Sequence, residues 1–341
     1  MLPWQDQLAN SITSAQQLAR YFVVDEEARK ACEKFPVRIP PYVLSLAMRS
    51  QAVARQFVPD GAELLDGGAA DPLREEDARP VAGIIHRYPD RLLLMAGSRC
   101  AANCRFCMRK GRVGRSRVQS PRSRVEDPKS EVEDDSAQEG SRSYFNKEEA
   151  AEGVEYIRGK PDVRQVIISG GDPLLLEDDE LIGLLDAVRS IGHVRVVRIH
   201  TRAPATLPMR ITAELCRGLG QRQPLYVIAH FNHPDELTAQ ATEACSMLAD
   251  AGVPLGNQSV LLRDVNDNPA VMQKLVEGLL EVRVRPYYLH HPDGTRGTRH
   301  FDVAVSRGLS IVEHLRQRCS GLAVPQYVRD EPCAPFKRPL N

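Results

Sequence analysis

From residue 91 onward, short apolar runs rich in β-branched residues alternate with longer segments whose apolar residues recur at helical spacing. The apolar runs predict six strands, at residues 91–97, 163–169, 194–200, 224–230, 253–262 and 282–290. The amphipathic segments predict six helices, at residues 147–159, 178–191, 211–220, 235–252, 268–282 and 303–318. Most of these units span about 30 residues, the length of a strand plus its crossover helix. The pattern therefore predicts a parallel sheet with helices outside it.

Six strand–helix units are fewer than the eight that close a β/α barrel. We therefore predict an α/β protein whose residues 81–335 form a partial (β/α)6 TIM-like barrel, in preference to a doubly wound sheet. Residues 1–60 combine capping-type residues with helical apolar spacing, and a loop rich in Gly, Asp and Pro follows to about residue 80. Residues 1–80 are thus predicted to be an N-terminal helical extension.

One stretch inside the predicted barrel breaks the alternation. Residues 114–143 are polar, rich in serine, basic in their first part and acidic afterwards, with no apolar periodicity. Such a segment cannot bury enough apolar surface to order itself, so we predict a disordered surface insertion.

Composition narrows the class of protein. The 341 residues are 42% hydrophobic and 26% charged, and 45 Lys and Arg balance 45 Asp and Glu. This balance gives no general basic surface for nucleic acid. No apolar run approaches the roughly 18 residues that cross a membrane, and the N-terminus lacks the basic and apolar regions of a signal peptide. We expect a cytoplasmic protein with neither a nucleic-acid nor a membrane partner.

Three of the eight cysteines, Cys100, Cys104 and Cys107, lie within eight residues directly after the first predicted strand. That position is the carboxyl-end mouth of the sheet, where such folds build active sites. Three thiolates can hold a four-iron cluster and leave one iron open to another ligand. A zinc site completed by a distant fourth ligand, and three unrelated thiols, are the alternatives.

The CxxxCxxC spacing resembles the signature of the radical S-adenosylmethionine (SAM) superfamily. A glycine motif after the second strand strengthens this resemblance, because residues 169–173 read Ser-Gly-Gly-Asp-Pro. The resemblance implies a [4Fe-4S] cluster on the three cysteines and SAM bound to its open iron. It also implies that Gly170, Gly171 and Asp172 contact SAM, and that the cluster's electron comes from a donor such as flavodoxin or ferredoxin.

Nearly the whole chain is similar to the lysine 2,3-aminomutase family, through segments that include HRYPDRLLL, SGGDPLL, GVPLGNQSVLL and VRPYYLHHPD. The resemblance implies a second cofactor, pyridoxal 5′-phosphate (PLP). The expected reaction moves the amino group of L-lysine from C2 to C3 through a 5′-deoxyadenosyl radical and gives β-lysine. The chain would thus be an isomerase.

The resemblance also assigns residues to PLP. Lys337, in the C-terminal segment 321–341, aligns with the family's Schiff-base lysine. Arg87, Tyr88 and Arg91 align with its phosphate-binding residues. Two arginines beside a phenol suit a phosphate dianion, because arginine offers forked, charged donors.

The substrate residues follow from the same resemblance. Arg109 occupies the position that pairs with the substrate carboxylate, and Asp293 and Asp330 occupy those that hold the distal ammonium group of lysine. Two carboxylates around one ammonium would reject glutamate, because its charge would remain unpaired. We also expect Gln258 to contact SAM or PLP, and His230 to face the cofactors.

Some features depart from the longer lysine enzymes. The sequence ends at Asn341 without their cysteine-rich zinc-binding tail, and Asn268 stands where they have a zinc-binding cysteine. We therefore expect no structural zinc, and assembly into a homo-oligomer stays open. The alternatives are the branch that makes (R)-β-lysine for elongation factor P, an arginine or glutamate aminomutase, and a non-catalytic iron–sulfur protein.

Overall fold

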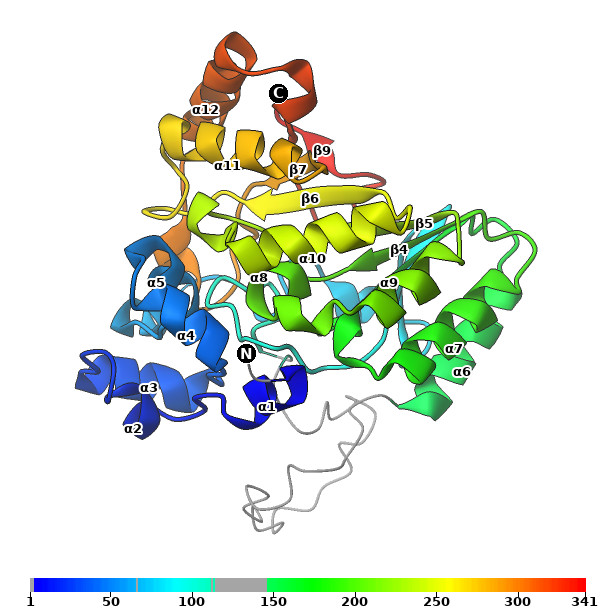
Figure 1. Ribbon diagram of the computed structural model, residues 1–341, viewed down its shortest axis with the longest axis horizontal. Coiled ribbons are helices and arrows are strands. Elements are labelled where there is room, and N and C mark those ends of the chain that lie inside the picture. The colour runs from blue at the N-terminus through cyan, green and yellow to red at the C-terminus, as the bar shows by residue number, and fades with distance from the viewer. Residues whose placement is uncertain (1–2, 66, 112, 114–145) are drawn as a thin grey trace.

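The computed structural model describes residues 3–65, 67–111, 113 and 146–341 (Figure 1). The insertion predicted at residues 114–143 lies outside these described residues. Within them, no helix has both the length and the apolar character needed to cross a membrane.

One nine-stranded sheet organises the fold, and its strands follow one another in chain order. They are β1 (Ile84–Tyr88), β2 (Arg91–Met95), β3 (Gln165–Ser169), β4 (Val196–His200), β5 (Leu225–Ala229), β6 (Leu255–Val260), β7 (Val284–His290), β8 (Gln326–Arg329) and β9 (Arg338–Pro339). Strands β2 to β8 run parallel, whereas β1 and β9 pair antiparallel at the two edges. Strands β1 and β9 lie at opposite ends of the strand order, so the described sheet is open, as predicted for a partial barrel.

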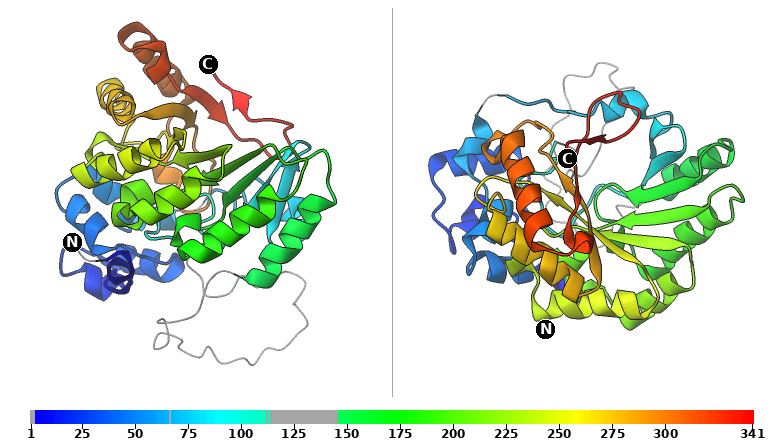
Figure 2. Two further views of the ribbon diagram at one scale, coloured as in Figure 1. Left: turned by 45° about the vertical axis from the view of Figure 1, so that its right-hand side comes forward. Right: turned by 90° about the horizontal axis from the view of Figure 1, so that it is seen from above.

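The six predicted strands correspond to β2–β7, and all six predicted helices are present. These helices are α6 (Lys147–Arg158), α7 (Asp178–Arg189), α9 (Ala213–Gly220), α10 (Ala239–Asp250), α11 (Pro269–Glu281) and α12 (Val305–Arg318). Side chains of Asn146, Thr212, Thr238 and Asn268 accept hydrogen bonds from the first turns of α6, α9, α10 and α11, which fixes where those helices begin. The helices surround the outside of the curved sheet (Figure 2).

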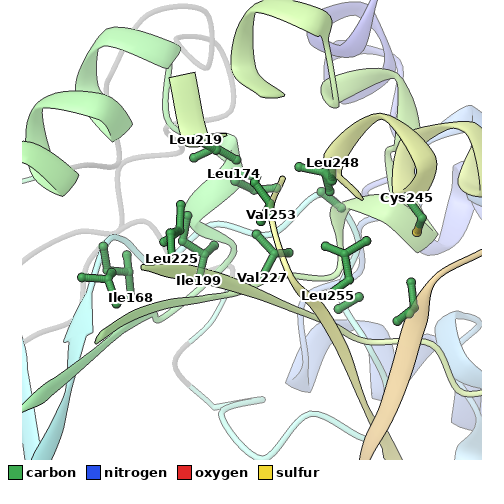
Figure 3. Close-up of a cluster of buried hydrophobic side chains, with 14 of the residues drawn as sticks. Ile168, Leu174, Ile199, Leu219, Leu225, Val227, Cys245, Leu248, Val253 and Leu255 are labelled. Atoms are coloured by element: carbon green, nitrogen blue, oxygen red, sulfur yellow. The ribbon is translucent and has the colours of Figure 1, made fainter. Parts of the chain in front are cut away.

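Burial alternates along the strands and separates the two faces of the sheet. In β4, Val197 and Ile199 are buried while Arg198 and His200 are only partly covered. The buried positions pack under the helices, as Figure 3 shows for Ile199 close to other apolar side chains of this layer. Because side chains alternate across a strand, Arg198 and His200 face the concave side.

The N-terminal residues form helices with a separate small core. The helices are α1 (Trp4–Ala9), α2 (Ala15–Leu18), α3 (Glu26–Lys34), α4 (Pro41–Ala47) and α5 (Gln51–Phe57). Their core includes Ala102, and Cys104 packs against it, so the extension touches the cysteine loop directly. The remaining helical turns are α8 (Ala203–Thr206), η1 (Gly61–Leu64), η2 (Glu75–Ala78), η5 (Pro173–Leu175), η6 (Pro208–Arg210), η7 (Pro234–Glu236), η8 (Arg299–Phe301) and η9 (Gly321–Ala323).

Candidate active site

One cavity of about 670 Å³ lies against the concave face of the sheet. Its walls come from the inner positions of the strands and from the loops at their carboxyl ends. Every site residue that the sequence singled out lines this cavity: Arg87, Tyr88, Arg91, Cys100, Cys104, Cys107, Arg109, Gly170, Gly171, Asp172, His230, Gln258, Asp293, Asp330 and Lys337. Residues more than 200 positions apart in the chain thus share one space.

The cysteine loop follows β2 and is held by the N-terminal extension. The backbone N–H of Asn103 donates to the carbonyl of Arg38 at 3.0 Å, and that of Arg105 donates to the carbonyl of Gln56 at 2.8 Å. The three cysteines are partly buried. The extension therefore forms one side of the loop that carries the thiols.

Close backbone packing explains the two glycines after β3. Gly170 has a φ of 115°, a region that favours glycine, and a Cβ there would lie 2.6 Å from the Gly97 carbonyl oxygen. A Cβ on Gly171 would lie 2.1 Å from the carbonyl oxygen of Arg99. The N–H of Gly171 also donates to Gly97 at 2.7 Å. Glycines are needed here because the loop after β3 rests directly on the chain that enters the cysteine loop.

The Asp172 carboxylate joins the loop after β3 to the loop after β4. It accepts hydrogen bonds from the Thr201 hydroxyl at 2.7 Å and from the backbone N–H of Arg202 at 2.8 Å. Burial raises its pKa above the usual value, which these hydrogen bonds partly offset. In this structure Asp172 therefore positions Arg202.

Arg202 points from this junction to the cysteine loop. Its Nη1 donates to the sulfur of Cys104 at 2.7 Å, and its Nη2 donates to Gln56 and Glu236 at 2.6 and 2.7 Å. Burial raises the pKa of Cys107 to about 11, and Cys104 adds to the shift. Thiolates in this loop need a positive neighbour, and Arg202 supplies one at Cys104.

The donor set fits an iron–sulfur cluster. Three thiols from one loop line the cavity, and a cationic donor contacts one of them. Among the residues with assigned positions, no three His, Cys, Asp or Glu side chains gather tightly enough to hold a single metal ion. Three thiolates from one loop suit a [4Fe-4S] cluster, because each of them would bind a different iron.

A buried ion triad of Glu63, Arg105 and Lys110 connects the cysteine loop to η1. Glu63, in η1, accepts hydrogen bonds from Arg105 Nε at 2.8 Å and from Lys110 Nζ at 2.6 Å. All three side chains are at most 4% exposed. Burial alone would raise the pKa of Glu63, but Arg105 and Lys110 bring it below the usual value. The sequence analysis treated residues 60–80 only as a loop and missed this contact.

We expect Glu63→Gln to lower the free energy of unfolding by about 3 kcal/mol, because it leaves two buried cations without their counter-charge. Chemical denaturation of the purified protein measures the change. Glu214→Gln is the matched control, since Glu214 pairs with Arg217 on the surface and both side chains are more than 60% exposed. Loss of this surface pair should lower the free energy of unfolding by less than about 1 kcal/mol. Equal effects of the two substitutions would contradict a supporting role for the triad.

Arg109 meets a second carboxylate from the same loop. Its Nε and Nη2 donate to the two oxygens of Glu75 at 2.9 and 2.7 Å. This forked pair fixes the guanidinium plane at the cavity wall. The fork uses two of the five N–H groups of Arg109, one on Nε and one on Nη2.

Lys337 lies on the other side of the cavity, just before β9. Its Nζ donates to Asp330, and the guanidinium of Arg87 lies 3.8 Å from the same carboxylate. Burial alone would raise the pKa of Asp330, but Lys337 and other nearby positive groups lower it. Arg91 stacks over the ring of Tyr88 at 4.1 Å. The predicted PLP residues therefore form one basic group around Asp330.

Asp293 differs from Asp330 in its surroundings. Its Oδ1 atom is buried and has no hydrogen-bond partner among the described residues. Burial raises its pKa to about 7, with a further rise from the charge of Asp330. A buried carboxylate oxygen without a partner is costly, so this position favours a bound cation.

Sequence reasoning missed four residues that shape the cavity or its loops: Glu63, Glu75, His200 and Arg202. The two glutamates lie in a segment without periodicity, and the one local signal is the capping box that Glu63 forms with Asp60 at the start of η1. The run Arg198-Ile199-His200 does carry a signal, because polar residues alternate with an apolar one inside a strand. Applied to each strand, that alternation would have assigned His200 to the inner face.

An open, parallel α/β sheet with three cysteines and a glycine motif at its mouth defines a radical SAM protein, and the sequence matches the Radical SAM superfamily over residues 95–275. The chain is 40% identical to L-lysine 2,3-aminomutase of Clostridium subterminale over 99% of its length and 77% of that protein. It is 36% identical to glutamate 2,3-aminomutase of Clostridioides difficile, covering 98% of this chain and 75% of that one. The chain therefore belongs to the lysine 2,3-aminomutase family of radical SAM isomerases.

Proposed function

We propose that this chain is a PLP-dependent aminomutase that converts L-lysine into β-lysine by moving the amino group from C2 to C3. The observation that carries the proposal is the shared cavity, which joins the three thiols, the basic group at Lys337 and Asp293, whose Oδ1 has no partner among the described residues. Supply of the cluster's electron by a flavodoxin or ferredoxin and a cytoplasmic location belong to the same proposal.

The chain's own residues have distinct tasks in this reaction. Cys100, Cys104 and Cys107 would hold the cluster, and Lys337 would hold PLP. When bound, SAM supplies a 5′-deoxyadenosyl radical, and PLP carries the migrating amino group. The cavity walls would orient the substrate and exclude water and other sources of hydrogen.

Substrate recognition divides between the two sides of the cavity. Arg109, oriented by Glu75, would bind the carboxylate of lysine. Asp293 would bind the distal ammonium, since its Oδ1 has no partner among the residues described. Asp330 is already paired with Lys337, so its first task would be to position that lysine.

We expect Asp293→Asn to raise the KM for lysine about 30-fold, because a lost contact with a buried charge costs about 2 kcal/mol or more. Steady-state kinetics with purified, oxygen-protected enzyme measure it. Asp302→Asn is the matched control, because Asp302 pairs with Arg299 away from the cavity lining. An unchanged KM in Asp293→Asn with wild-type turnover would refute the ammonium contact.

A pH profile tests the same residue without a substitution. Asp293 has a pKa of about 7 before substrate binds, so it is largely neutral at lower pH and attracts an ammonium only when ionised. The KM for lysine should therefore fall as the pH rises from about 6 to about 8. In Asp293→Asn this part of the pH dependence should disappear. The same slope in both proteins would assign it to another group.

Glutamate is the rival substrate, since a relative carries that name. Asp293 disfavours it, because a glutamate side chain would place a second negative charge beside a buried carboxylate. Anaerobic assays with lysine, arginine and glutamate as separate substrates decide the matter. A 2,3-shifted product from glutamate but not from lysine would overturn the proposed substrate.

A further inference from the structure

His200 is a cavity residue that the proposed function leaves without a task. It ends β4 and lines the cavity from the concave face of the sheet. Its Nε2 atom is buried and makes no hydrogen bond to any described residue. A buried imidazole nitrogen without a partner is unfavourable, so a position of this kind favours a ligand that supplies the missing contact.

Gln258 determines which nitrogen of His200 carries the proton. The amide Nε2 of Gln258 lies 3.2 Å from His200 Nδ1. An amide nitrogen can only donate, so Nδ1 accepts and the ring proton resides on Nε2. His200 thus presents an N–H donor to the cavity. The sequence analysis singled out Gln258 as a cofactor contact, and here it orients a second residue.

The surroundings of His200 are positively charged. Burial lowers its pKa well below the ordinary value, and the charges of Arg198 and Lys337 lower it further. The ring is therefore neutral at physiological pH and donates without adding charge. A hydrogen-bond donor among cations selects an acceptor that is itself negative.

Position along the strands indicates which bound group offers that acceptor. Arg198 precedes His200 by two residues in β4 and so faces the same side of the sheet. Arg91 of β2 and Arg198 both line the cavity, and Lys337 lies within electrostatic range of His200. The charges of Arg198 and Lys337 act on His200 more strongly than that of Arg109. An anionic ligand attached at Lys337 is therefore the acceptor that we assign to His200, whereas Arg109 serves the substrate carboxylate.

We propose that His200 Nε2–H donates a hydrogen bond to an anionic oxygen of bound PLP, and that Gln258 is the positioning residue that orients the ring. The inference rests on the proposed function, because it needs PLP at Lys337. It goes beyond that function by adding a contact from β4 to the predicted phosphate residues and lysine.

The test measures PLP binding without substrate, so it does not depend on turnover. The dissociation constant of PLP and the absorption spectrum of PLP bound to the protein's own lysine are recorded for wild type, His200→Leu and His200→Asn. Melting temperatures check that each variant is folded. The matched control is His314→Leu, because His314 lies on α12, contacts Gln273 and does not line the cavity.

We expect His200→Leu to weaken PLP binding about tenfold, the size of a lost hydrogen bond to a charged acceptor, and to shift the absorption band. His200→Asn keeps a donor and should lie closer to wild type, whereas His314→Leu should match it. Wild-type affinity and spectrum in a folded His200→Leu protein would overturn the inference. So would a change confined to the KM for lysine, which would place the acceptor on the substrate. Failure of wild type to bind PLP would instead refute the proposed function.

Discussion

Replacing Cys104 by serine should abolish both the iron–sulfur cluster and turnover. In the proposed function three thiols of one loop hold the cluster, and a hydroxyl is a far weaker iron ligand than a thiolate. Cys104 also accepts the hydrogen bond from Arg202, so the substitution removes the contact that places a positive charge beside the sulfur. Iron and sulfide content after anaerobic reconstitution, with the visible and electron paramagnetic resonance spectra, measure the loss.

Cys319→Ser is the control for this experiment. Cys319 is also partly buried, but it follows α12 and does not line the cavity. The Cys319→Ser variant should retain the cluster and the activity of wild type. A Cys104→Ser protein with a full iron complement, or a wild type that binds only one zinc ion, would contradict the assignment of the three thiols.

Lys337→Ala should lower the turnover number by about a thousandfold or more, because loss of a residue that forms a covalent bond in catalysis has effects of this size. The variant should also lack the absorption band of lysine-bound PLP. Asp330 would then have lost its closest positive partner, so its pKa should rise toward the ordinary value or above it. Anaerobic kinetics measure the turnover number, and absorption spectroscopy measures the band.

Lys30→Ala removes a lysine of the same type from the surface of α3, where its side chain is 55% exposed. It should leave the spectrum and turnover unchanged. If Lys337→Ala retained the band, another lysine would hold PLP, and the basic group around Asp330 would need a different explanation.

The sequence predicted the central fold well because its signals were local. Strands β2–β7 and the helices between them each carry their own apolar period. Strands β1, β8 and β9 were missed. Strands β8 and β9 have only four and two residues, whereas β1 is as long as β2 but follows its two apolar residues with His86 and Arg87, so it shows no apolar alternation. These strands depend on pairing with their neighbours rather than on their own composition.

The predicted site residues share one cavity, but the contacts between them could not be read from the sequence. The resemblance placed Arg109 and Asp330 in the site without indicating that Glu75 and Lys337 already pair with them. The pair of Arg109 with Glu75 joins positions 34 residues apart and depends on a loop of irregular geometry, whereas the pair of Lys337 with Asp330 depends on the turn between β8 and β9. Ion pairs of this kind follow from the folded arrangement, so only a structure reveals them.

The hydrogen bonds between the cysteine loop and the backbone of Arg38 and Gln56 make the position of the three thiols dependent on the first sixty residues. A chimaera that joins this barrel to a different N-terminal segment would have to keep the residues on both sides of these hydrogen bonds. Local unfolding of the N-terminal extension would then be detected first as loss of the iron–sulfur absorption, before the barrel itself unfolds.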